Sequence, residues 1–460
     1  MIETSCDDTA VAVLETHEPH DGNSRSTSPN AAAATLHFNE KITANNAIYK
    51  GVHPIVSLES HQTNLATLVQ TALSCDRVQK ALSRNATLKP NFISVTRGPG
   101  MRSNLATGLD TAKGLSVALN IPLVGVHHMQ AHALTPRLVS ALASGSGSVG
   151  NGNGNGNGNG NGNGNGNSLD PGFPFLSLLV SGGHTLLLES TGLTDHRVLA
   201  ETSDVAVGDA IDKIARFILP EEVIASSAST MYGPILETFA FPDAVGDEGA
   251  GYSYTAPRTR AEEMARKPTQ WGWQFNPPLA ETSGGKKSRS MEFSFTGLVS
   301  AVERFMRYKW DHEQGRITRT VRDVEAPVEE RRAMAREAMR IGFEHMGSRI
   351  VMGLQSLSAS DNASSEKPNA LVVSGGVASN QFLRHVLRAF LDARGFGHVR
   401  LLFPPPALCT DNAAMIAWAG IEMFRTGCTS ELGVQPIRKW SLDPQAEDGG
   451  ILGVGGWIKK

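Results

Sequence analysis

The sequence has few cysteines and no long apolar segment. Its four cysteines, at positions 6, 75, 409 and 428, are scattered along 460 residues and form no Cys-x-x-Cys pair. This spacing excludes a disulfide framework and a thiolate metal site, and it favours a reducing compartment. No apolar run approaches the roughly 18 residues that span a bilayer, so we expect no membrane partner. Because the formal net charge is −3, any nucleic-acid contact has to come from a local basic patch.

The N-terminus enters a structured motif almost at once. The run from Thr9 to Leu14 predicts the second strand of a hairpin, and only a few residues precede it to form the first strand. Nothing before the hairpin resembles a targeting peptide. We therefore interpret the N-terminus as truncated.

Three polar stretches interrupt the rest of the chain, at residues 19–36, 143–169 and 243–290. The second is mostly alternating Gly and Asn, a composition that cannot bury a core, and we expect all three to be insertions into a compact fold. Between them, strands alternate with helices, which predicts an α/β architecture with mostly parallel central strands. The expected strands are 91–96, 121–126, 175–181 and 370–374, and the expected helices are 61–73, 104–119, 206–218, 327–354 and 379–393.

One short phrase occurs twice, each time at the end of an apolar run. Ser181-Gly182-Gly183 follows Leu179 and Val180, and Ser374-Gly375-Gly376 follows Val372 and Val373. Residues without a Cβ let backbone N–H groups approach a ligand closely. A single copy is most simply a turn, but the repetition predicts a duplicated fold that holds a nucleotide-like ligand from two sides.

A pair of histidines and an aspartate are candidate metal ligands. His128 and His132 are four residues apart, so on a helix they share one face. Met129 stands where a zincin has its catalytic glutamate, which excludes the His-Glu-x-x-His motif. Asp411 could be a third ligand, or it could simply cap the apolar helix that follows. Two imidazoles and a carboxylate suit Zn²⁺ or Fe²⁺ with open positions for a substrate.

Several motifs occur in the order found in one known family. They are Ile2–Thr9, Gly98–Gly100, His128–His132, Val180–Thr185, Ser294–Leu298, Ser374–Asn380 and Cys409–Asn412. The chain resembles the tRNA N6-adenosine threonylcarbamoyltransferases, formerly labelled O-sialoglycoprotein endopeptidases, over essentially its whole length. The wording of the first, fourth and last motifs is similar to the bacterial and mitochondrial branch, and the Asn-Gly tract is typical of a eukaryotic nuclear gene. The resemblance therefore implies a mitochondrial member.

The resemblance implies an actin-like (ASKHA) α/β fold, in which two duplicated βαβ-rich lobes hold the ligand in the cleft between them. We expect an N-terminal lobe at 1–124, a C-terminal lobe at 125–412, a helix at 413–445 that returns to the first lobe, and a tail at 446–460.

The implied reaction moves a threonylcarbamoyl group from threonylcarbamoyl-adenylate to the N6 amine of adenosine 37 in tRNAs that read ANN codons, and releases AMP. The implied partners are tRNA, a separate synthase that makes the adenylate, and a second copy of the chain in a homodimer, in the mitochondrial matrix. Two alternatives stay open. A metallopeptidase would need a general base beside the histidines, and a sugar-kinase-like ATPase would not need the two histidines and Asp411 together.

The resemblance also assigns roles to individual residues. His128, His132 and Asp411 would hold one divalent ion, zinc or iron, and Asp8 would orient the attacking amine. The substrate-binding residues would be Leu179, Val180, Ser181, Gly182, Gly183, Asp212, Gly233 and Asn380. The family's Tyr-Pro-Gly-Gly-Pro is shortened here to Tyr232-Gly233-Pro234, which weakens the placement of Gly233. His61 matches a family histidine that we interpret as structural.

Two basic stretches are candidates for contact with tRNA phosphates. One lies in the 243–290 insertion and the other follows Ser294. A solvated loop and a solvated helix face are the alternatives. The residues are Arg258, Arg260, Arg266, Lys267, Lys286, Lys287 and Arg289 in the first, and Arg304, Arg307 and Lys309 in the second.

Overall fold

The computed structural model describes residues 1–17, 33–46, 49, 51–145, 169–227, 231–244, 251–265, 268–280, 286–359 and 366–459. Most of the expected insertions at 19–36 and 143–169 lies outside these residues, as do 245–250, 281–285 and the pair Arg266 and Lys267 of the third. The chain forms two compact units. Unit 1 comprises Met1–Phe173, Thr191–His196 and Thr410–Lys460, and unit 2 comprises Pro174–Ser190 and Arg197–Cys409.

The first unit extends well past the lobe boundary expected at residue 124. The strand β5 (Leu123–His127) pairs in parallel with β4 (Ile93–Gly98), so the chain is still inside the first sheet at that point. The helix that follows, α4 (His128–Gly145), packs on α13 (Ala413–Arg425) from the C-terminal segment. Residues on both sides of 124 therefore share one hydrophobic core.

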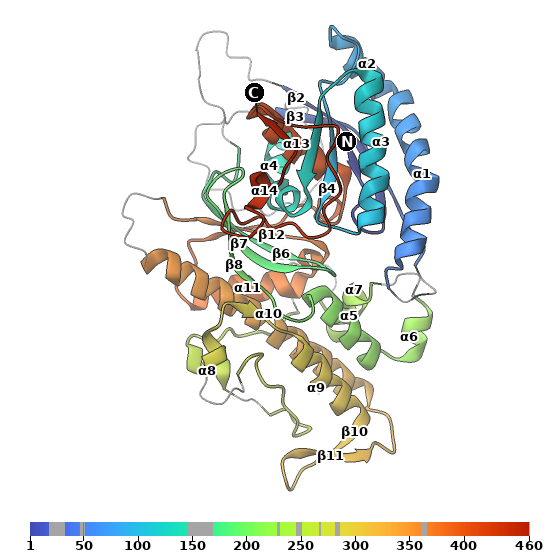
Figure 1. The fold of residues 1–460 in the computed structure, drawn as a ribbon. Helices are drawn as coiled ribbons and strands as arrows, with labels where there is room; N and C mark the ends of the chain where they lie inside the picture. The colour runs from blue at the N-terminus through green and yellow to red at the C-terminus, as the bar shows by residue number, and fades with distance from the viewer. Residues whose placement is uncertain are drawn as a thin grey trace. The chain divides into compact units, whose positions relative to one another are not determined.

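Unit 1 is a seven-stranded sheet with helices on both faces (Figure 1). Helices α1 (Pro54–Ser74) and α3 (Arg102–Leu119) cover one face, and α4 and α13 cover the other. Two shorter helices, α2 (Asp76–Arg84) and α14 (Gly450–Gly453), complete the unit. The strand order is β15 (Trp457–Lys459), β14 (Cys428–Ser430), β5, β4, β1 (Ile2–Glu3), β2 (Asp8–His17) and β3 (Ala33–Thr43).

The N-terminal hairpin expected from the sequence is present. β1 has only two residues, and it pairs antiparallel with β2 through Ile2 opposite Val11 and Glu3 opposite Ala10. β1 also pairs in parallel with β4, through Ile2 and Val95. Ile2, Val11 and Val95 are all buried, so burial of apolar side chains holds the short strand at the centre of the sheet.

Unit 2 is built on a six-stranded sheet and a separate two-stranded hairpin. The sheet order is β13 (Arg400–Leu402), β12 (Ala370–Ser374), β6 (Phe175–Val180), β7 (Thr185–Ser190), β8 (His196–Thr202) and β9 (Glu292–Phe293). The long helix α10 (Val328–Ala359) contacts α5 (Val207–Ile218), α7 (Gly233–Ala240), α9 (Thr296–Arg307) and α11 (Gln381–Ala393). The hairpin joins β10 (Tyr308–Asp311) to β11 (Arg316–Val321), and the short helices are α6 (Glu221–Ala225), α8 (Arg260–Met264) and α12 (Pro406–Cys409).

The two units repeat one topology. In unit 1 the order β3-β2-β1-β4-β5 places two parallel strands on one side of β1 and an antiparallel hairpin on the other. In unit 2 the order β8-β7-β6-β12-β13 does the same around β6. The duplicated α/β architecture is therefore confirmed. No helix within the described ranges combines the length and apolar character needed to cross a bilayer.

The repeated Ser-Gly-Gly phrase does not mark this duplication. Both copies belong to unit 2, where β6 and β12 are parallel neighbours and Ser374 pairs with Leu179. The two turns are thus adjacent corners of one sheet. Predicting a duplicated fold from the repeat was correct in outcome but wrong in its reason, because the corresponding turns of unit 1 are Glu3–Asp8 and Arg97–Gly100.

Candidate metal centre and glycine turns

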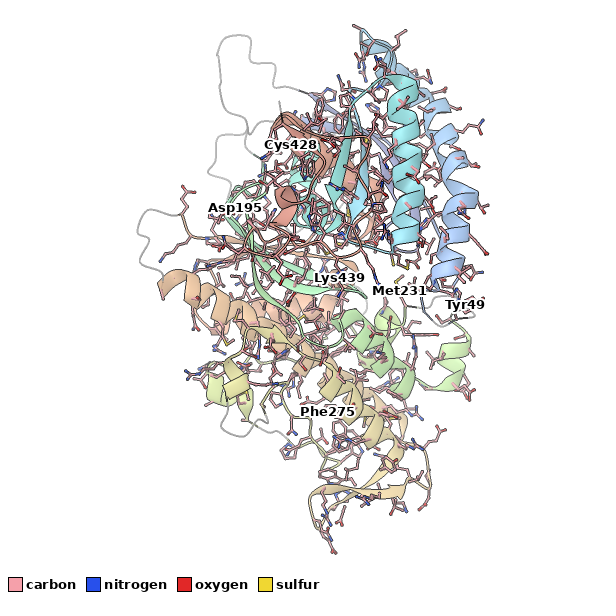
Figure 2. The ribbon with its side chains drawn as sticks, in the orientation of Figure 1. Tyr49, Asp195, Met231, Phe275, Cys428 and Lys439 are labelled. Carbon is pink, nitrogen blue, oxygen red and sulfur yellow. The ribbon has the colours of Figure 1, made fainter. Side chains whose placement is uncertain are left out.

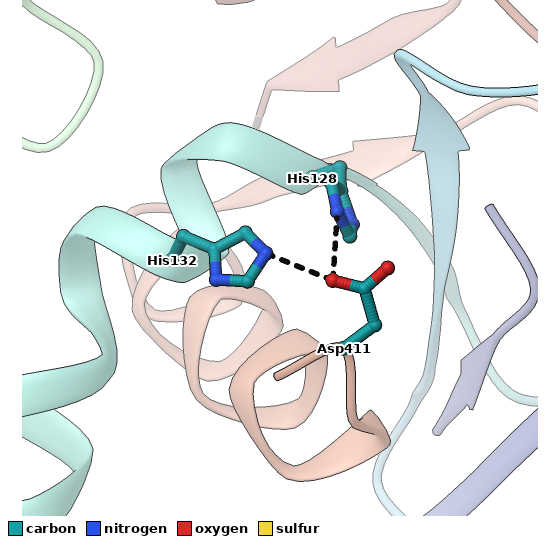
Figure 3. Close-up of side chains that lie close together, drawn as sticks. All are labelled: His128, His132 and Asp411. Atoms are coloured by element: carbon teal, nitrogen blue, oxygen red, sulfur yellow. Dashed lines mark hydrogen bonds and ion pairs between the residues drawn. The ribbon is translucent and has the colours of Figure 1, made fainter. Parts of the chain in front are cut away.

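The histidine pair lies at the junction of β5 and α4. β5 ends at His127 and α4 begins at His128, so His128 and His132 are one turn apart on the helix. Both side chains are buried, and their ring centroids are 4.8 Å apart. Asp411 reaches them from the turn that precedes α13 (Figure 3). Its Oδ1 lies 3.1 Å from Nε2 of His132 and 3.4 Å from Nε2 of His128.

Asp411 does not cap α13. The N-cap is Asn412, whose side-chain oxygen accepts a hydrogen bond of 3.0 Å from the Met415 backbone N–H. The capping alternative for Asp411 is therefore wrong, and its carboxylate instead faces the two imidazoles. One ligand atom from each of the three residues lies within 4.8 Å of the others. The sequence brought the right three residues together, although it could not say which neighbour would cap the helix.

A buried glutamate supports the centre from behind. Oε2 of Glu3 lies 3.3 Å from Nδ1 of His128, and Glu3 also accepts hydrogen bonds from the Ser5 N–H and the Thr96 hydroxyl. A carboxylate on the distal nitrogen of a ligating histidine is a common arrangement at metal sites, since it fixes the ring and its tautomer. Sequence reasoning assigned no role to Glu3, which is the last residue of β1.

The charges of the site favour a bound cation. Burial would lower the pKa of His128, but the carboxylates of Asp411 and Glu3 outweigh it and raise that pKa to about 10. Burial would raise the pKa of Asp411, yet His128 and His132 hold it well below its usual value. Two carboxylates and two imidazoles in a buried space need positive charge. With Nε2, Nε2 and Oδ1 converging, the residues fit a divalent ion, and the partly exposed Asp411 leaves one side open.

Asp8 is linked to the same loop through a lysine. Its Oδ2 accepts from Lys41 Nζ at 2.8 Å, and its Oδ1 accepts from the Thr43 hydroxyl. Lys41 also donates to Oγ1 of Thr410 at 3.1 Å and to the Asp411 carbonyl oxygen at 3.4 Å. Sequence reasoning missed Lys41, because its position depends on the register that places it opposite Ala10 in β2 and β3.

His61 has the structural position that we expected. Its Nδ1 is 2.7 Å from the Thr9 hydroxyl, and its Nε2 is 3.0 Å from the Cys6 carbonyl oxygen. Burial lowers the pKa of this imidazole, so its neutral form donates from Nε2 to the Cys6 carbonyl and accepts from Thr9. His61 thereby fixes the turn between β1 and β2.

The turn after β6 presents backbone rather than side chains. Gly182 and Gly183 are exposed, and no atom lies within 4 Å of the position that a Cβ would take at either residue. The Ser181 hydroxyl accepts from the N–H groups of Gly183 and His184, at 3.3 and 3.0 Å. The predicted substrate residues Leu179 and Val180 differ from these, because both are buried inside β6 and pair with β7. Their side chains belong to the core.

The other predicted substrate residues of unit 2 have structural partners. Oδ1 of Asp212 accepts from the N–H groups of Tyr232 and Gly233, at 2.8 and 3.0 Å, and so holds the start of α7. Burial raises the pKa of Asp212. The Asn380 side-chain oxygen accepts from the Leu383 N–H at 2.8 Å and caps α11. Asp212, Gly233 and Asn380 therefore fix two helix N-termini in unit 2.

Two α/β units of one topology, one bearing a buried His-His-Asp centre and the other two glycine turns, define a protein of the actin-like class with a candidate metal centre. The model of the TsaD family, tRNA N6-adenosine threonylcarbamoyltransferase, matches residues 37–146 and 162–418. The chain belongs to this family.

Similar relatives carry the same name. A mitochondrial tRNA N6-adenosine threonylcarbamoyltransferase from Schizosaccharomyces pombe is 33% identical, with 100% of this chain and 88% of the relative covered. The enzyme from Rhizobium leguminosarum bv. trifolii is 32% identical over 99% of this chain and 96% of its own length. A mitochondrial relative from Rattus norvegicus is 30% identical over 95% and 83%. The similarity thus extends over both units.

Proposed function

We propose that this chain transfers a threonylcarbamoyl group from threonylcarbamoyl-adenylate to the N6 amine of adenosine 37 in tRNA and releases AMP. The observation that carries the proposal is the assembled His128, His132 and Asp411 centre in a chain of this family. A peptidase would need a carboxylate base next to the histidine pair, and the position after His128 is Met129.

The reaction is a substitution at the carbamoyl carbon. The N6 amine attacks the carbamoyl carbon, the bond from that carbon to the phosphate oxygen breaks, and AMP leaves with the electron pair while the amine proton is lost. Charge therefore develops on the carbamoyl oxygen and on the leaving phosphate, and fixed donors and cations stabilise both. A bound Zn²⁺ or Fe²⁺ would supply Lewis acidity for this charge. His128, His132 and Asp411 would hold that ion, and Glu3 would orient the His128 ring.

The chain's own groups would do the rest. Asp8, held by Lys41 and Thr43, would accept a hydrogen bond from the attacking amine and so orient it. The Ser181–Gly183 turn would bring its exposed glycine backbone close to the phosphate, because neither Gly182 nor Gly183 has a Cβ and no atom lies within 4 Å of either Cβ position. Asp212, Gly233 and Asn380 would place the nucleoside through the two helix N-termini that they fix.

We extend the proposal to the location and assembly of the enzyme. Two of the three relatives described above are named mitochondrial, which supports the mitochondrial matrix. We propose a homodimer that needs no helper subunit, and light scattering of the purified chain, alone and with tRNA, tests this directly. A monomer that becomes active only after addition of a cell extract would contradict it.

The test of the function is a reconstitution. Purified protein is incubated with threonine, bicarbonate, ATP, a synthase that makes the adenylate, and unmodified tRNA, and the tRNA is then digested and analysed by mass spectrometry. We expect threonylcarbamoyladenosine and an equal amount of AMP that depends on tRNA. A metal-loaded protein that makes none with a substrate tRNA would overturn the proposal. The Met129→Glu variant, which restores the zincin pattern, should gain no peptidase activity.

A further inference from the structure

The end of α9 and the β10–β11 hairpin concentrate positive charge in a chain that is acidic overall. Between residues 304 and 322 the sequence has six Arg or Lys and only two acidic residues, whereas the whole chain has a net charge of −3. Within its own unit the hairpin extends beyond α9, away from the six-stranded sheet (Figure 1). The basic residues are Arg304, Arg307, Lys309, Arg316, Arg319 and Arg322.

Two of these six charges are neutralised internally. Arg322 makes a bidentate contact with Glu330, at 2.7 and 2.9 Å, and also donates to the Phe305 carbonyl. Lys309 is paired with Asp323. Arg322 therefore anchors the hairpin to α10 and does not offer its charge to a ligand.

The other four arginines are exposed and have no acidic partner within salt-bridge distance among the described residues. Arg304 and Arg307 lie on the last two turns of α9, and Arg316 and Arg319 lie on β11. An exposed guanidinium without a carboxylate can donate several hydrogen bonds to a phosphate. These four residues, Arg304, Arg307, Arg316 and Arg319, are called the arginine set below.

The hairpin that carries Arg316 and Arg319 is anchored to the core of unit 2. Trp310 lies opposite Ile317 in the ladder, and its ring centroid is 5.6 Å from that of Phe305. Phe275, labelled in Figure 2, packs on Phe305 at 5.5 Å. Gly272 has φ +84° and lies so close to Trp310 that a Cβ there would be 2.7 Å from the indole nitrogen. Because this apolar contact fixes the hairpin, little backbone entropy is lost when its charges meet a ligand.

The other basic stretch is less suited to bind a ligand. Arg260 donates to Glu263, to the Ser348 hydroxyl at 2.8 Å and to the Ser288 carbonyl, so its guanidinium is occupied inside unit 2. Burial lowers the pKa of Arg260. Arg266 and Lys267 lie outside the described residues. The hairpin is thus the better candidate of the two.

We propose that the arginine set is a docking surface for the phosphate backbone of tRNA. The inference rests on the proposed function, since it takes the RNA from the reaction. The set contains only arginines, and the apolar residues of the hairpin, Trp310 and Ile317, face the protein core. Guanidinium groups can donate two hydrogen bonds each to phosphate oxygens, so we expect the affinity for tRNA to depend on salt.

The test compares two double variants of equal charge change. Arg316→Glu with Arg319→Glu reverses half of the arginine set, and Arg77→Glu with Lys80→Glu reverses two exposed basic residues on α2 in unit 1. Binding of an unmodified tRNA transcript is followed by fluorescence anisotropy over about 50 to 300 mM KCl. We expect the hairpin variant to bind at least tenfold more weakly, with a salt slope smaller by about one for each phosphate that is no longer neutralised. The α2 variant should remain within about twofold of wild type.

The outcomes separate this proposal from the reaction. If the hairpin variant binds tRNA like wild type, with the same salt slope, the proposed docking surface is wrong. The proposed transferase activity is tested separately, by the reconstitution assay. If wild type makes no threonylcarbamoyladenosine but the hairpin variant still loses tRNA affinity, the docking surface is supported and the proposed transferase function is wrong. Anionic phosphatidylserine vesicles are the second probe. Loss of vesicle binding with unchanged tRNA affinity would overturn the RNA assignment, and an unchanged melting temperature and metal content excludes misfolding.

Discussion

The corresponding corners of the two units carry different chemistry. At the end of the first strand of unit 1 stand Glu3, Thr4 and Ser5, which are all buried and hydrogen-bonded through their side chains. After the first strand of unit 2 come Ser181, Gly182 and Gly183, of which the glycines are exposed and leave open space at the Cβ position. One topology thus carries a candidate cation site made of side chains in unit 1 and an exposed glycine turn in unit 2.

A second corner shows what the two units share. The turn after β4 packs across the turn after β1, the turn after β12 packs across the end of β6, and a glycine stands at each crossing. A Cβ on Gly100 would be 2.8 Å from the Ser5 carbonyl oxygen, and a Cβ on Gly375 would be 2.3 Å from the Val180 carbonyl oxygen. The close approach of the two turns is a requirement of the fold, because it is the same in both units. The polar groups around it differ between the units, and we attribute them to function.

The largest loss of activity is expected when candidate metal ligands are removed from unit 1. His128→Ala with His132→Ala removes two of three ligands, so bound metal should fall from about one to near zero per chain, and transfer should fall at least 100-fold, about 2.7 kcal/mol in the barrier. Plasma mass spectrometry measures the metal and tRNA digestion measures the product. His312→Ala with His398→Ala, two exposed histidines of unit 2, is the control and should change neither. A fully active double variant would contradict the metal assignment.

A substitution at the glycine where the two turns of unit 2 cross should lower the stability of the protein. Gly375 has φ +98°, so Gly375→Ala adds backbone strain to the clash with Val180, and the free energy of unfolding should fall by about 2 to 4 kcal/mol. Gly376→Ala is the matched control, because nothing lies within 4 Å of its Cβ position; its stability should change by less than about 0.5 kcal/mol. Urea unfolding measures both. Equal stability of the two variants would mean that the crossing can relax.

The local elements and the candidate metal ligands on α4 could be recognised in the sequence because they depend on short-range patterns. The spacing of His128 and His132 alone placed both imidazoles on one helix face, and the strands expected at 91–96 and 370–374 are present as β4 and β12. Glu3 and Lys41 were not assigned, since their roles depend on contacts made across the sheet, with His128 and with Asp8. Such contacts follow from strand register and packing, which composition and periodicity do not encode.

One alternative that stayed open and one wrong inference have physical causes. Asp411 and Asn412 are both good N-cap residues, so the sequence could not decide which of them would cap α13 and which would face the histidines. The two Ser-Gly-Gly turns look like the copies of a duplicated unit, but sequence likeness reflects similar local backbone needs rather than topological equivalence. In unit 1 the turn that corresponds to Ser181–Gly183 contains no glycine. The glycines nearest to it belong to the neighbouring turn Gly98–Gly100, which packs across it.

The weakest effect is expected from the different electrostatic surroundings of two buried histidines, one in each unit. His128 in unit 1 and His345 in unit 2 are both buried, yet their pKa values shift in opposite directions. Two carboxylates raise the pKa of His128 to about 10, whereas burial, Arg349 and Arg260 lower the pKa of His345 well below its usual value. His345 is therefore neutral in the folded protein, where its Nε2 accepts from the Ser294 N–H at 3.2 Å.

The sign of the pH dependence follows from the unfolded state. Below about pH 6.5 an unfolded histidine takes up a proton that folded His345 refuses, so this residue costs stability as pH falls, by up to about 1.4 kcal/mol per pH unit. His128 acts the other way in metal-free protein: its contribution is fully present below about pH 6.5 and is lost as pH rises toward 10. We expect His345→Gln, which keeps an acceptor for Ser294, to unfold in urea with a shallower loss of stability between pH 7 and pH 5 than the wild type. An identical slope in the two proteins would mean that His345 is protonated in the folded state.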